Sequence, residues 1–213
     1  MPEPRPIRLH RFRLSGHSHR VELMLSLLQR PTEIVDVPSG QQKSPAFLAM
    51  NPFGQVPVIE DDGTVVADSN AILVYLALKY DPARRWYPAD AESAAEVQRW
   101  LSVAAGPLFS GPAVARLVGL FDAGHDLGRA QAVAVSVLGV MEAHLAKAGS
   151  FFAGANPTIA DVALYSYTAH APEGHVSLEP YPQIRAWLRR IEGLPGFVPM
   201  VRSVPKFGGP AVS

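Results

Sequence analysis

Near the end of the first quarter of the chain the sequence reads Asn51-Pro52-Phe53-Gly54-Gln55-Val56-Pro57-Val58-Ile59-Glu60. Its β-branched residues predict a strand from Val56 to Glu60, yet Pro57 has no N–H to donate to a sheet. Two interpretations stay open. Pro57 simply begins the strand, or an edge position or a cis Val56–Pro57 bond turns the N–H and C=O of Val56 outward to pair with an extended ligand backbone.

The residues that follow this segment predict a hairpin and a helix. Asp61-Asp62-Gly63 separates the strand 56–60 from a second β-branched run, Thr64 to Ala67. An Asp-Gly pair between two such runs is a strong hairpin signal, so we expect the two strands to be antiparallel neighbours. Ser69 then opens a compact helix that runs from Ala71 to Lys79.

The residues that precede the segment predict alternating strands and helices. Ile7 and Leu9 alternate with polar residues, which is the period of a strand, and apolar residues then recur at helical spacing after Ser18 as N-cap. The expected elements are a strand from Ile7, a helix from Ser18 that ends before Pro31, a strand Glu33–Val37 and a short helix Pro45–Met50. The first 80 residues thus read βαβαββα, which predicts a mixed four-stranded sheet whose first pair is parallel.

The rest of the chain is predicted to be all-α. Residues 81–91 hold prolines, arginines and aromatic residues without an apolar period, which is typical of a linker. Beyond them, apolar residues recur at spacings of three and four in Glu92–Leu120, Arg129–Ala148, Ile159–Ala171 and Gln183–Glu192. We therefore expect an α/β domain at 1–80, a linker at 81–91 and a helical-bundle domain at 92–213.

Composition excludes several classes of function. The 19 basic residues balance the 19 acidic ones, so bulk charge does not favour nucleic-acid binding. The chain has no signal-like or membrane-length apolar run, and we expect a cytoplasmic protein without a membrane partner. It contains no cysteine, which excludes thiolate metal sites and a thiol nucleophile of its own, and we expect no metal. Any sulfur chemistry must use the thiol of a ligand.

The predicted N-termini of two helices could bind anions. At Asp68-Ser69, peptide N–H groups and the Ser69 hydroxyl could hold a carboxylate while Asp68 accepts from an ammonium group, or the pair could simply cap the helix. At Ser15-Gly16-His17-Ser18, a hydroxyl could stabilise a thiolate, or the four residues could form only a turn and a cap with exposed histidines. The first site would fit an amino-acid zwitterion.

Together these motifs resemble those of cytosolic-type glutathione S-transferases over nearly the whole chain. Gln55-Val56-Pro57 resembles the family's cis-proline segment, and Asp68-Ser69-Asn70-Ala71-Ile72 resembles its Glu/Asp-Ser-x-Ala-Ile signature. In the second half, Asn156 to Asp161 resembles the family's capping box and staple, and Tyr181 to Phe197 resembles its closing helices. The resemblance implies a thioredoxin-like N-terminal domain, an all-helical C-terminal domain, and assembly as a homodimer.

The resemblance also implies a role for each matching residue, with glutathione as the cosubstrate. Ser15 aligns with the catalytic serine of the serine-type classes and would hydrogen-bond the thiolate; if Ser18 faces the ligand instead, the roles exchange. The other contacts would be Val56, beside Pro57, with the cysteinyl backbone, Ser69 and Asp68 with the γ-glutamyl end, Gln55 in support, and Lys43 with the glycyl carboxylate.

The energy available is sufficient for this role of a serine. An unperturbed thiol has a pKa of about 8.5, and lowering it by about two units requires about 2.7 kcal/mol. A hydrogen bond from a hydroxyl to an anion contributes roughly 1.5–3 kcal/mol, and the helix N-terminus adds to it. The thiolate would then attack an electrophilic small molecule.

The segment from Ser15 to Val21 departs from the zeta-class motif Ser-Ser-Cys-x-Trp-Arg-Val, because His17 stands at the cysteine position and His19 at the tryptophan position. This argues against isomerase activity of the zeta kind. Two alternatives to a transferase remain open: a non-catalytic regulatory protein resembling stringent starvation proteins, and a glutathione-dependent lyase, reductase or isomerase. Trp100, Val103 and Phe109 form an apolar stripe at helical spacing. This stripe could line the electrophile pocket together with Phe12 and Leu14, or it could belong to the core.

Overall fold

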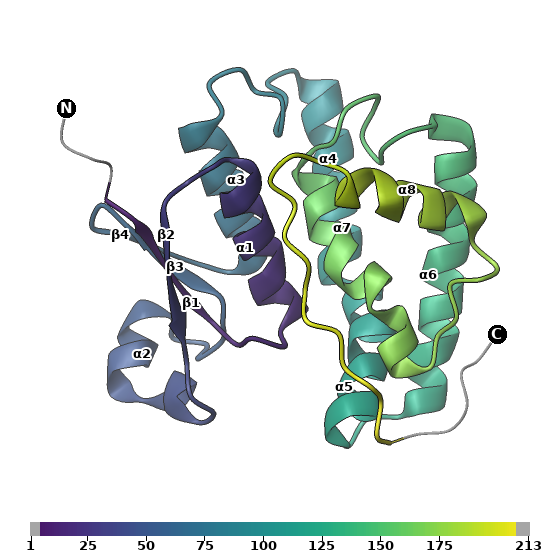
Figure 1. Cartoon of the computed structure of the whole chain (residues 1–213), viewed down its shortest axis with the longest axis horizontal. Helices are drawn as coiled ribbons and strands as arrows, with labels where there is room; N and C mark the ends of the chain where they lie inside the picture. The colour runs from purple at the N-terminus through teal and green to yellow at the C-terminus, as the bar shows by residue number, and fades with distance from the viewer. Residues whose placement is uncertain (1–4, 208–213) are drawn as a thin grey trace.

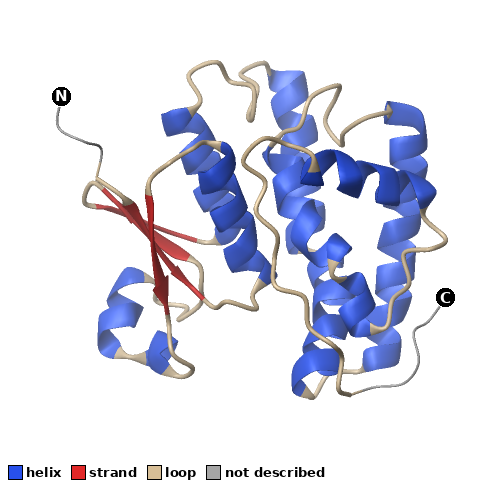
Figure 2. Cartoon of the chain, in the orientation of Figure 1, coloured by secondary structure: helices blue, strands red, loops and turns tan. Residues whose placement is uncertain are grey.

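The structure of the protein is a computed structural model, which describes residues 5–207. A small β-sheet with its helices lies beside a larger half that is built from helices (Figure 1). Figure 2 shows the strands gathered in the N-terminal half. The α/β region followed by an all-helical region, predicted from the sequence, is therefore confirmed.

The sheet has the strand order β2-β1-β3-β4. β1 (Ile7–Arg11) pairs in parallel with β2 (Thr32–Asp36) and antiparallel with β3 (Val58–Asp61), which in turn pairs antiparallel with β4 (Thr64–Ala67). The Asp62-Gly63 turn has positive φ at both residues, as its sequence predicts. The parallel first pair and the hairpin are both confirmed.

The α-helices of this half take two positions relative to the sheet. α1 (Gly16–Leu27) and α3 (Ser69–Tyr80) lie between the sheet and the helical half, and the short α2 (Pro45–Met50) lies away from it (Figure 1). The expected N-cap Ser18 is wrong: Ser15 caps α1 and accepts from the Ser18 N–H at 3.3 Å. Because the first turn of α1 is polar, the apolar spacing begins late and hid the true start of the helix.

The helical half contains α4 (Ala91–Ala105), α5 (Val114–Phe121), α6 (Leu127–Ala148), α7 (Ile159–Ala169) and α8 (Pro182–Glu192). The single helix expected over 92–120 is wrong. α4 ends at Gly106 because Pro107 disfavours the helical conformation in the residue before it, and a π-helical turn, Phe109–Ala113, then leads into α5.

One hydrophobic core runs through both halves, and α7 lies at its centre. Every residue of α7 is buried, and the helix contacts α1, α3 and α4. The capping box of Thr158 and Asp161 at its start is confirmed. The helical stretch Ala91–Phe121 is long and apolar enough to span a membrane by composition, but 56% of its most apolar window is buried in the protein, as in core helices of soluble proteins.

Candidate active site

A cavity of about 920 Å³ lies between the two halves of the molecule. Its walls come from the loop before α1, the segment before β3, the N-terminus of α3, and the π-helical turn, α5 and α7 of the helical half. Apart from the alternative Ser18, the residues that the sequence suggested for glutathione and its thiol line this cavity: Ser15, Lys43, Gln55, Val56, Pro57, Asp68 and Ser69. Segments far apart in the sequence therefore converge on one volume.

The Val56–Pro57 peptide bond is cis, and β3 begins directly after it at Val58. The side chain of Asn51 holds this segment, because its amide donates to the Gln55 carbonyl at 2.8 Å and its carbonyl accepts from the Phe53 N–H at 3.1 Å. Within residues 5–207, the peptide N–H and C=O of Val56 have no hydrogen-bond partner. They are available to an extended ligand backbone at the cavity wall.

The N-terminus of α3 combines a helix cap with a buried hydroxyl. One carboxylate oxygen of Asp68 accepts from the N–H groups of Asn70 and Ala71, at 2.9 and 3.0 Å, so Asp68 caps α3. Ser69 does not cap the helix. Its buried hydroxyl lies 3.2 Å from the His17 Nδ1 and accepts from the Arg20 Nη1 at 3.3 Å.

Arg20 places a buried positive charge beneath this N-terminus. Its side chain is 0% exposed, and burial lowers its pKa to about 10, which leaves it charged at neutral pH. Its Nη1 also donates to the Asn70 side chain at 2.8 Å, whereas its Nε and Nη2 have no partner in the described part of the chain. The helix dipole, the Ser69 hydroxyl and the Arg20 charge together make this end of the cavity suited to an anion.

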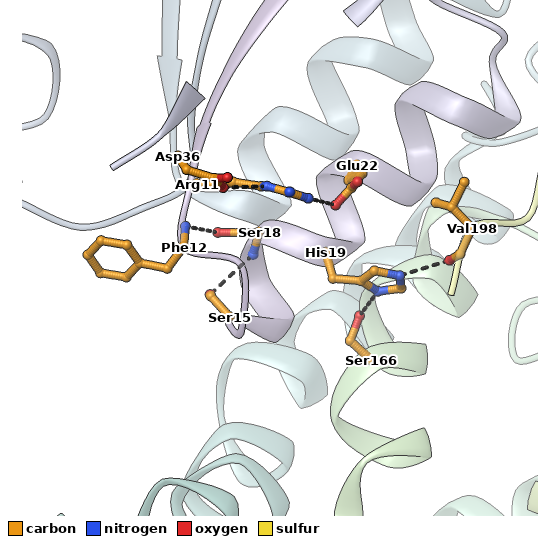
Figure 3. A network of polar contacts seen from close by, with 9 residues as sticks. All are labelled: Arg11, Phe12, Ser15, Ser18, His19, Glu22, Asp36, Ser166 and Val198. Atoms are coloured by element: carbon orange, nitrogen blue, oxygen red, sulfur yellow. Dashed lines mark hydrogen bonds and ion pairs between the residues drawn. The ribbon is translucent and has the colours of Figure 1, made fainter. Parts of the chain in front are cut away.

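The N-terminus of α1 brings Ser15 to the cavity. Figure 3 shows Ser15 at the start of the helix and the Ser18 hydroxyl directed toward Phe12, whose N–H donates to it at 3.3 Å. Ser18 is 1% exposed and is not among the cavity-lining residues, whereas Ser15 is. The loop before Ser15 is tied to the helical half, because the Arg116 Nη1 donates to the Leu14 carbonyl at 2.7 Å.

His17 stands in the cavity wall between the polar and the apolar sides. Its ring contacts the rings of Phe109 and Tyr167, with centroids 5.5 and 5.1 Å away. Burial, aided by the charge of Arg20, lowers the pKa of His17 to about 3, so the ring is neutral at physiological pH. The only hydrogen-bond partner of the ring among residues 5–207 is Ser69.

The apolar side of the cavity decides the open question about the aromatic stripe. Phe12, Leu14 and Phe109 line the cavity, and Trp100 and Val103 belong to the core instead. The rim carries Lys43, whose ammonium group donates to the Phe53 carbonyl at 3.0 Å. No group of three or more histidine, aspartate or glutamate side chains that could hold a metal ion occurs among the described residues.

The cavity-lining residues that sequence reasoning missed include Arg20 and Tyr167. Arg20 had no clear signal, because charged residues are mostly exposed and nothing in the sequence of α1 indicates that this one is buried. Tyr167 had none, because it lies on a helix that is buried on every side and its contact with the cavity depends on how the two halves pack.

Comparisons with known proteins agree over most of the chain. Family models match for the N-terminal domain of glutathione S-transferases over residues 14–79 and for their C-terminal domain over residues 94–190. Glutathione S-transferase 3 of Zea mays is 35% identical over an alignment of 214 positions, which covers 94% of this chain and 95% of the relative.

Solved structures agree as well. A glutathione S-transferase from Pseudomonas fluorescens superimposes with a TM-score of 0.85 at 32% identity, over 93% of this chain and 100% of that chain. A glutathione transferase homolog from Drosophila mojavensis, solved with bound glutathione, superimposes with a TM-score of 0.79 at 28% identity, over 89% of each chain.

Proposed function

The chain belongs to the glutathione S-transferase family, and from that membership we propose that it is a glutathione transferase that uses Ser15 to stabilise the thiolate of bound glutathione. The observation that carries the proposal is the convergence of three segments on one cavity: Ser15 at the start of α1, Val56 beside the cis bond, and Ser69 at the start of α3. Each offers a group that one part of the tripeptide requires.

The chemistry of these groups orients the ligand. The N–H and C=O of Val56, which no described residue pairs, bind the cysteinyl backbone. The γ-glutamyl carboxylate lies at the N-terminus of α3, where the Ser69 hydroxyl donates to it and the charge of Arg20 stabilises it. The ammonium group is placed near the free carboxylate oxygen of Asp68, with Gln55 in support, and the glycyl carboxylate reaches Lys43 at the rim.

This orientation places the cysteinyl sulfur near Ser15. The Ser15 hydroxyl donates to the thiolate and favours its ionised form, by roughly 1.5–3 kcal/mol for a hydrogen bond to a charged group. The electrophile binds against the apolar wall that Phe12, Leu14 and Phe109 provide. The sulfur attacks an electrophilic carbon, a carbon–sulfur bond forms, and the leaving group departs with its electron pair while the thiol proton goes to solvent.

Calorimetric titration with reduced glutathione, followed by a conjugation assay, tests the proposal. Micromolar to millimolar binding supports it. Ser15→Ala is expected to lower turnover roughly 10- to 100-fold with little change in the dissociation constant of glutathione, because one hydrogen bond to the anion is lost. Unchanged turnover would remove Ser15 from the mechanism.

A matched control separates this effect from the loss of a helix cap. Ser44 caps α2, accepts from the Phe47 N–H at 3.3 Å and does not line the cavity. Ser44→Ala is therefore expected to cost about 1 kcal/mol of stability, as any lost cap does, with turnover unchanged.

Ser69→Ala should have the opposite signature. Because Ser69 is proposed to donate to the γ-glutamyl carboxylate, its loss raises the dissociation constant of glutathione roughly 10-fold and leaves turnover at saturation nearly unchanged. Calorimetry on the variant measures the constant. An unaltered value would mean that Ser69 only fills the space beside His17 and Arg20.

The same titration decides between the transferase and its alternatives. No binding of glutathione would favour a non-catalytic interaction protein of this fold, and binding with isomerised or eliminated products would favour an isomerase or lyase.

We also propose a cytoplasmic homodimer. Phe53 at the cavity rim is 78% exposed and is an apolar group that a second copy would cover, and light scattering on the wild type and Phe53→Ser measures the assembly.

A further inference from the structure

Tyr167 of α7 reaches across from the helical half to the thiol site. Its side chain lies directly over Gly16, so closely that a Cβ on Gly16 would stand 2.7 Å from its Cε1 and 2.8 Å from its Cζ. Cζ is the carbon that carries the hydroxyl. The phenol therefore comes against the backbone between Ser15 and His17, and glycine at position 16 is what permits the approach.

The surroundings of the phenol keep its hydroxyl protonated. The side chain is 7% exposed, it lines the cavity, and its ring has the imidazole of His17 and the guanidinium of Arg20 as neighbours. Burial raises the pKa of Tyr167 above its ordinary value. Arg20, Arg116 and the backbone N–H of His17 act in the opposite direction but do not outweigh burial. At neutral pH the phenol is thus a hydrogen-bond donor.

The hydrogen bonds of Ser15 make this donor significant. A serine hydroxyl accepts two hydrogen bonds and donates one. The Ser15 oxygen already accepts from the Ser18 N–H at 3.3 Å. If the neighbouring Tyr167 hydroxyl donates to the same oxygen, both acceptor positions are filled and the Ser15 proton is left to point into the cavity. A hydroxyl that accepts hydrogen bonds is also a stronger donor.

We propose that Tyr167 is a positioning residue for the reaction, which orients the Ser15 hydroxyl toward the glutathione thiolate by donating to it from the helical half. This inference rests on the proposed function, and it assigns to α7 a part in thiol activation that is separate from the binding of the electrophile. The thiol site is complete only when α7 packs against the start of α1.

Tyr167→Phe tests the inference because it removes the hydroxyl and keeps the ring over Gly16. The measurements are the pKa of the bound glutathione thiol, followed by the ultraviolet absorption of the thiolate, and the dissociation constant of glutathione by calorimetry. Loss of one neutral hydrogen bond is expected to reduce the thiolate fraction and kcat at neutral pH by about 3- to 10-fold, with the dissociation constant unchanged.

Tyr165→Phe is the matched control. Tyr165 lies on the same helix, and its hydroxyl donates to Glu192 at 3.0 Å instead of reaching the cavity. This variant loses a tyrosine hydroxyl of α7 without touching the thiol site, so the thiol pKa is expected to stay at the wild-type value.

Gly16→Ala is a second probe, which leaves the Tyr167 hydroxyl in place. Because the added methyl group would displace the Tyr167 ring, this variant should raise the thiol pKa as Tyr167→Phe does.

A double-variant comparison decides how Tyr167 acts. If it acts through Ser15, Tyr167→Phe has no further effect on the thiol pKa in a Ser15→Ala background. Additive effects would overturn the positioning role and mean that the phenol contacts the sulfur directly. An unchanged thiol pKa in Tyr167→Phe, with glutathione still bound, overturns the inference and leaves the proposed function intact. Failure of the wild type to bind glutathione overturns both.

Discussion

His17 and His19 stand two residues apart on the first turn of α1 and meet different regions of the molecule. His19 is buried against the helical half, where its Nε2 donates to the Val198 carbonyl and its Nδ1 accepts from the Ser166 hydroxyl, each at 2.9 Å (Figure 3). His17 lines the cavity, and the one hydrogen-bond partner of its ring among residues 5–207 is Ser69. One ring nitrogen of His17 is thus left without a partner.

The same contrast separates the fully buried ionisable groups of the two regions. In the helical half, Asp161 accepts from the N–H groups of Phe152, Thr158 and the Trp187 indole at 2.9–3.0 Å. Beneath the cavity, Arg20 leaves two nitrogens without a partner. His19 and Asp161 thus use their hydrogen-bonding groups to hold the fold, whereas His17 and Arg20 beside the cavity keep hydrogen-bonding groups that the described residues do not satisfy.

Asp161→Ala should produce the largest effect on stability. The change removes the capping box of α7 and leaves buried donors of Phe152, Thr158 and Trp187 without an acceptor. Since each unsatisfied buried group costs about 1–3 kcal/mol, the free energy of unfolding is expected to fall by roughly 3–5 kcal/mol. Urea denaturation followed by circular dichroism measures it.

The control for this variant is another aspartate cap. Asp126 caps α6 on the surface and accepts from the Arg129 N–H at 2.9 Å. Asp126→Ala should cost about 1 kcal/mol, the usual value for a lost cap. Equal losses for the two variants would mean that the bonds of Asp161 to the Phe152 loop and to Trp187 add nothing, and the contrast between the two regions would lose its basis.

The comparison also explains what the sequence could predict. Local patterns gave the sheet, the hairpin and the capping box, because each depends on residues within a few positions of one another. The break at Gly106-Pro107 had a local signal that the apolar spacing concealed. Ser15 and Ser18 could not be distinguished, because both suit a cap and only the packing of the turn decides which one faces the cavity.

The candidate site was predictable to a similar depth. The suggested ligand contacts converge on one cavity, since each belongs to a motif tied to a helix start or a strand start. Their roles stay predictions. Arg20 and Tyr167 could not be placed from the sequence, because their position in the site depends on how α1, α3 and α7 pack together.

His19→Ala should destabilise the protein more than His17→Ala. Removing His19 leaves the Val198 carbonyl and the Ser166 hydroxyl buried without a partner and opens a cavity, with an expected loss of roughly 2–4 kcal/mol. Removing His17, which already faces a cavity, should cost about 1 kcal/mol or less. Urea denaturation of both variants measures the difference, and a larger loss for His17→Ala would reverse the assignment of the two regions.

The pH dependence of stability gives a smaller effect that both histidines share. Burial, with the charge of Arg20, lowers the pKa of His17 to about 3; burial, opposed by the Val198 carbonyl but aided by nearby cationic groups, lowers that of His19 to about 4. Below about pH 6.5 the unfolded chain therefore binds protons that the native state does not, and stability falls as the pH falls toward these values. Between about pH 7.5 and about pH 5.5 each histidine should lower the free energy of unfolding by about 1.4 kcal/mol.

His17→Asn and His19→Asn isolate these contributions. Each variant lacks one of the two groups, so over this interval it should lose about 1.4 kcal/mol less stability than the wild type does. Denaturation with urea at a series of pH values measures the slope for each protein. If the stability of His17→Asn has the same pH slope as that of the wild type, His17 takes up a proton in the native state. His17 would then be in contact with solvent, and not packed against Phe109 and Tyr167 in a wall that excludes charge.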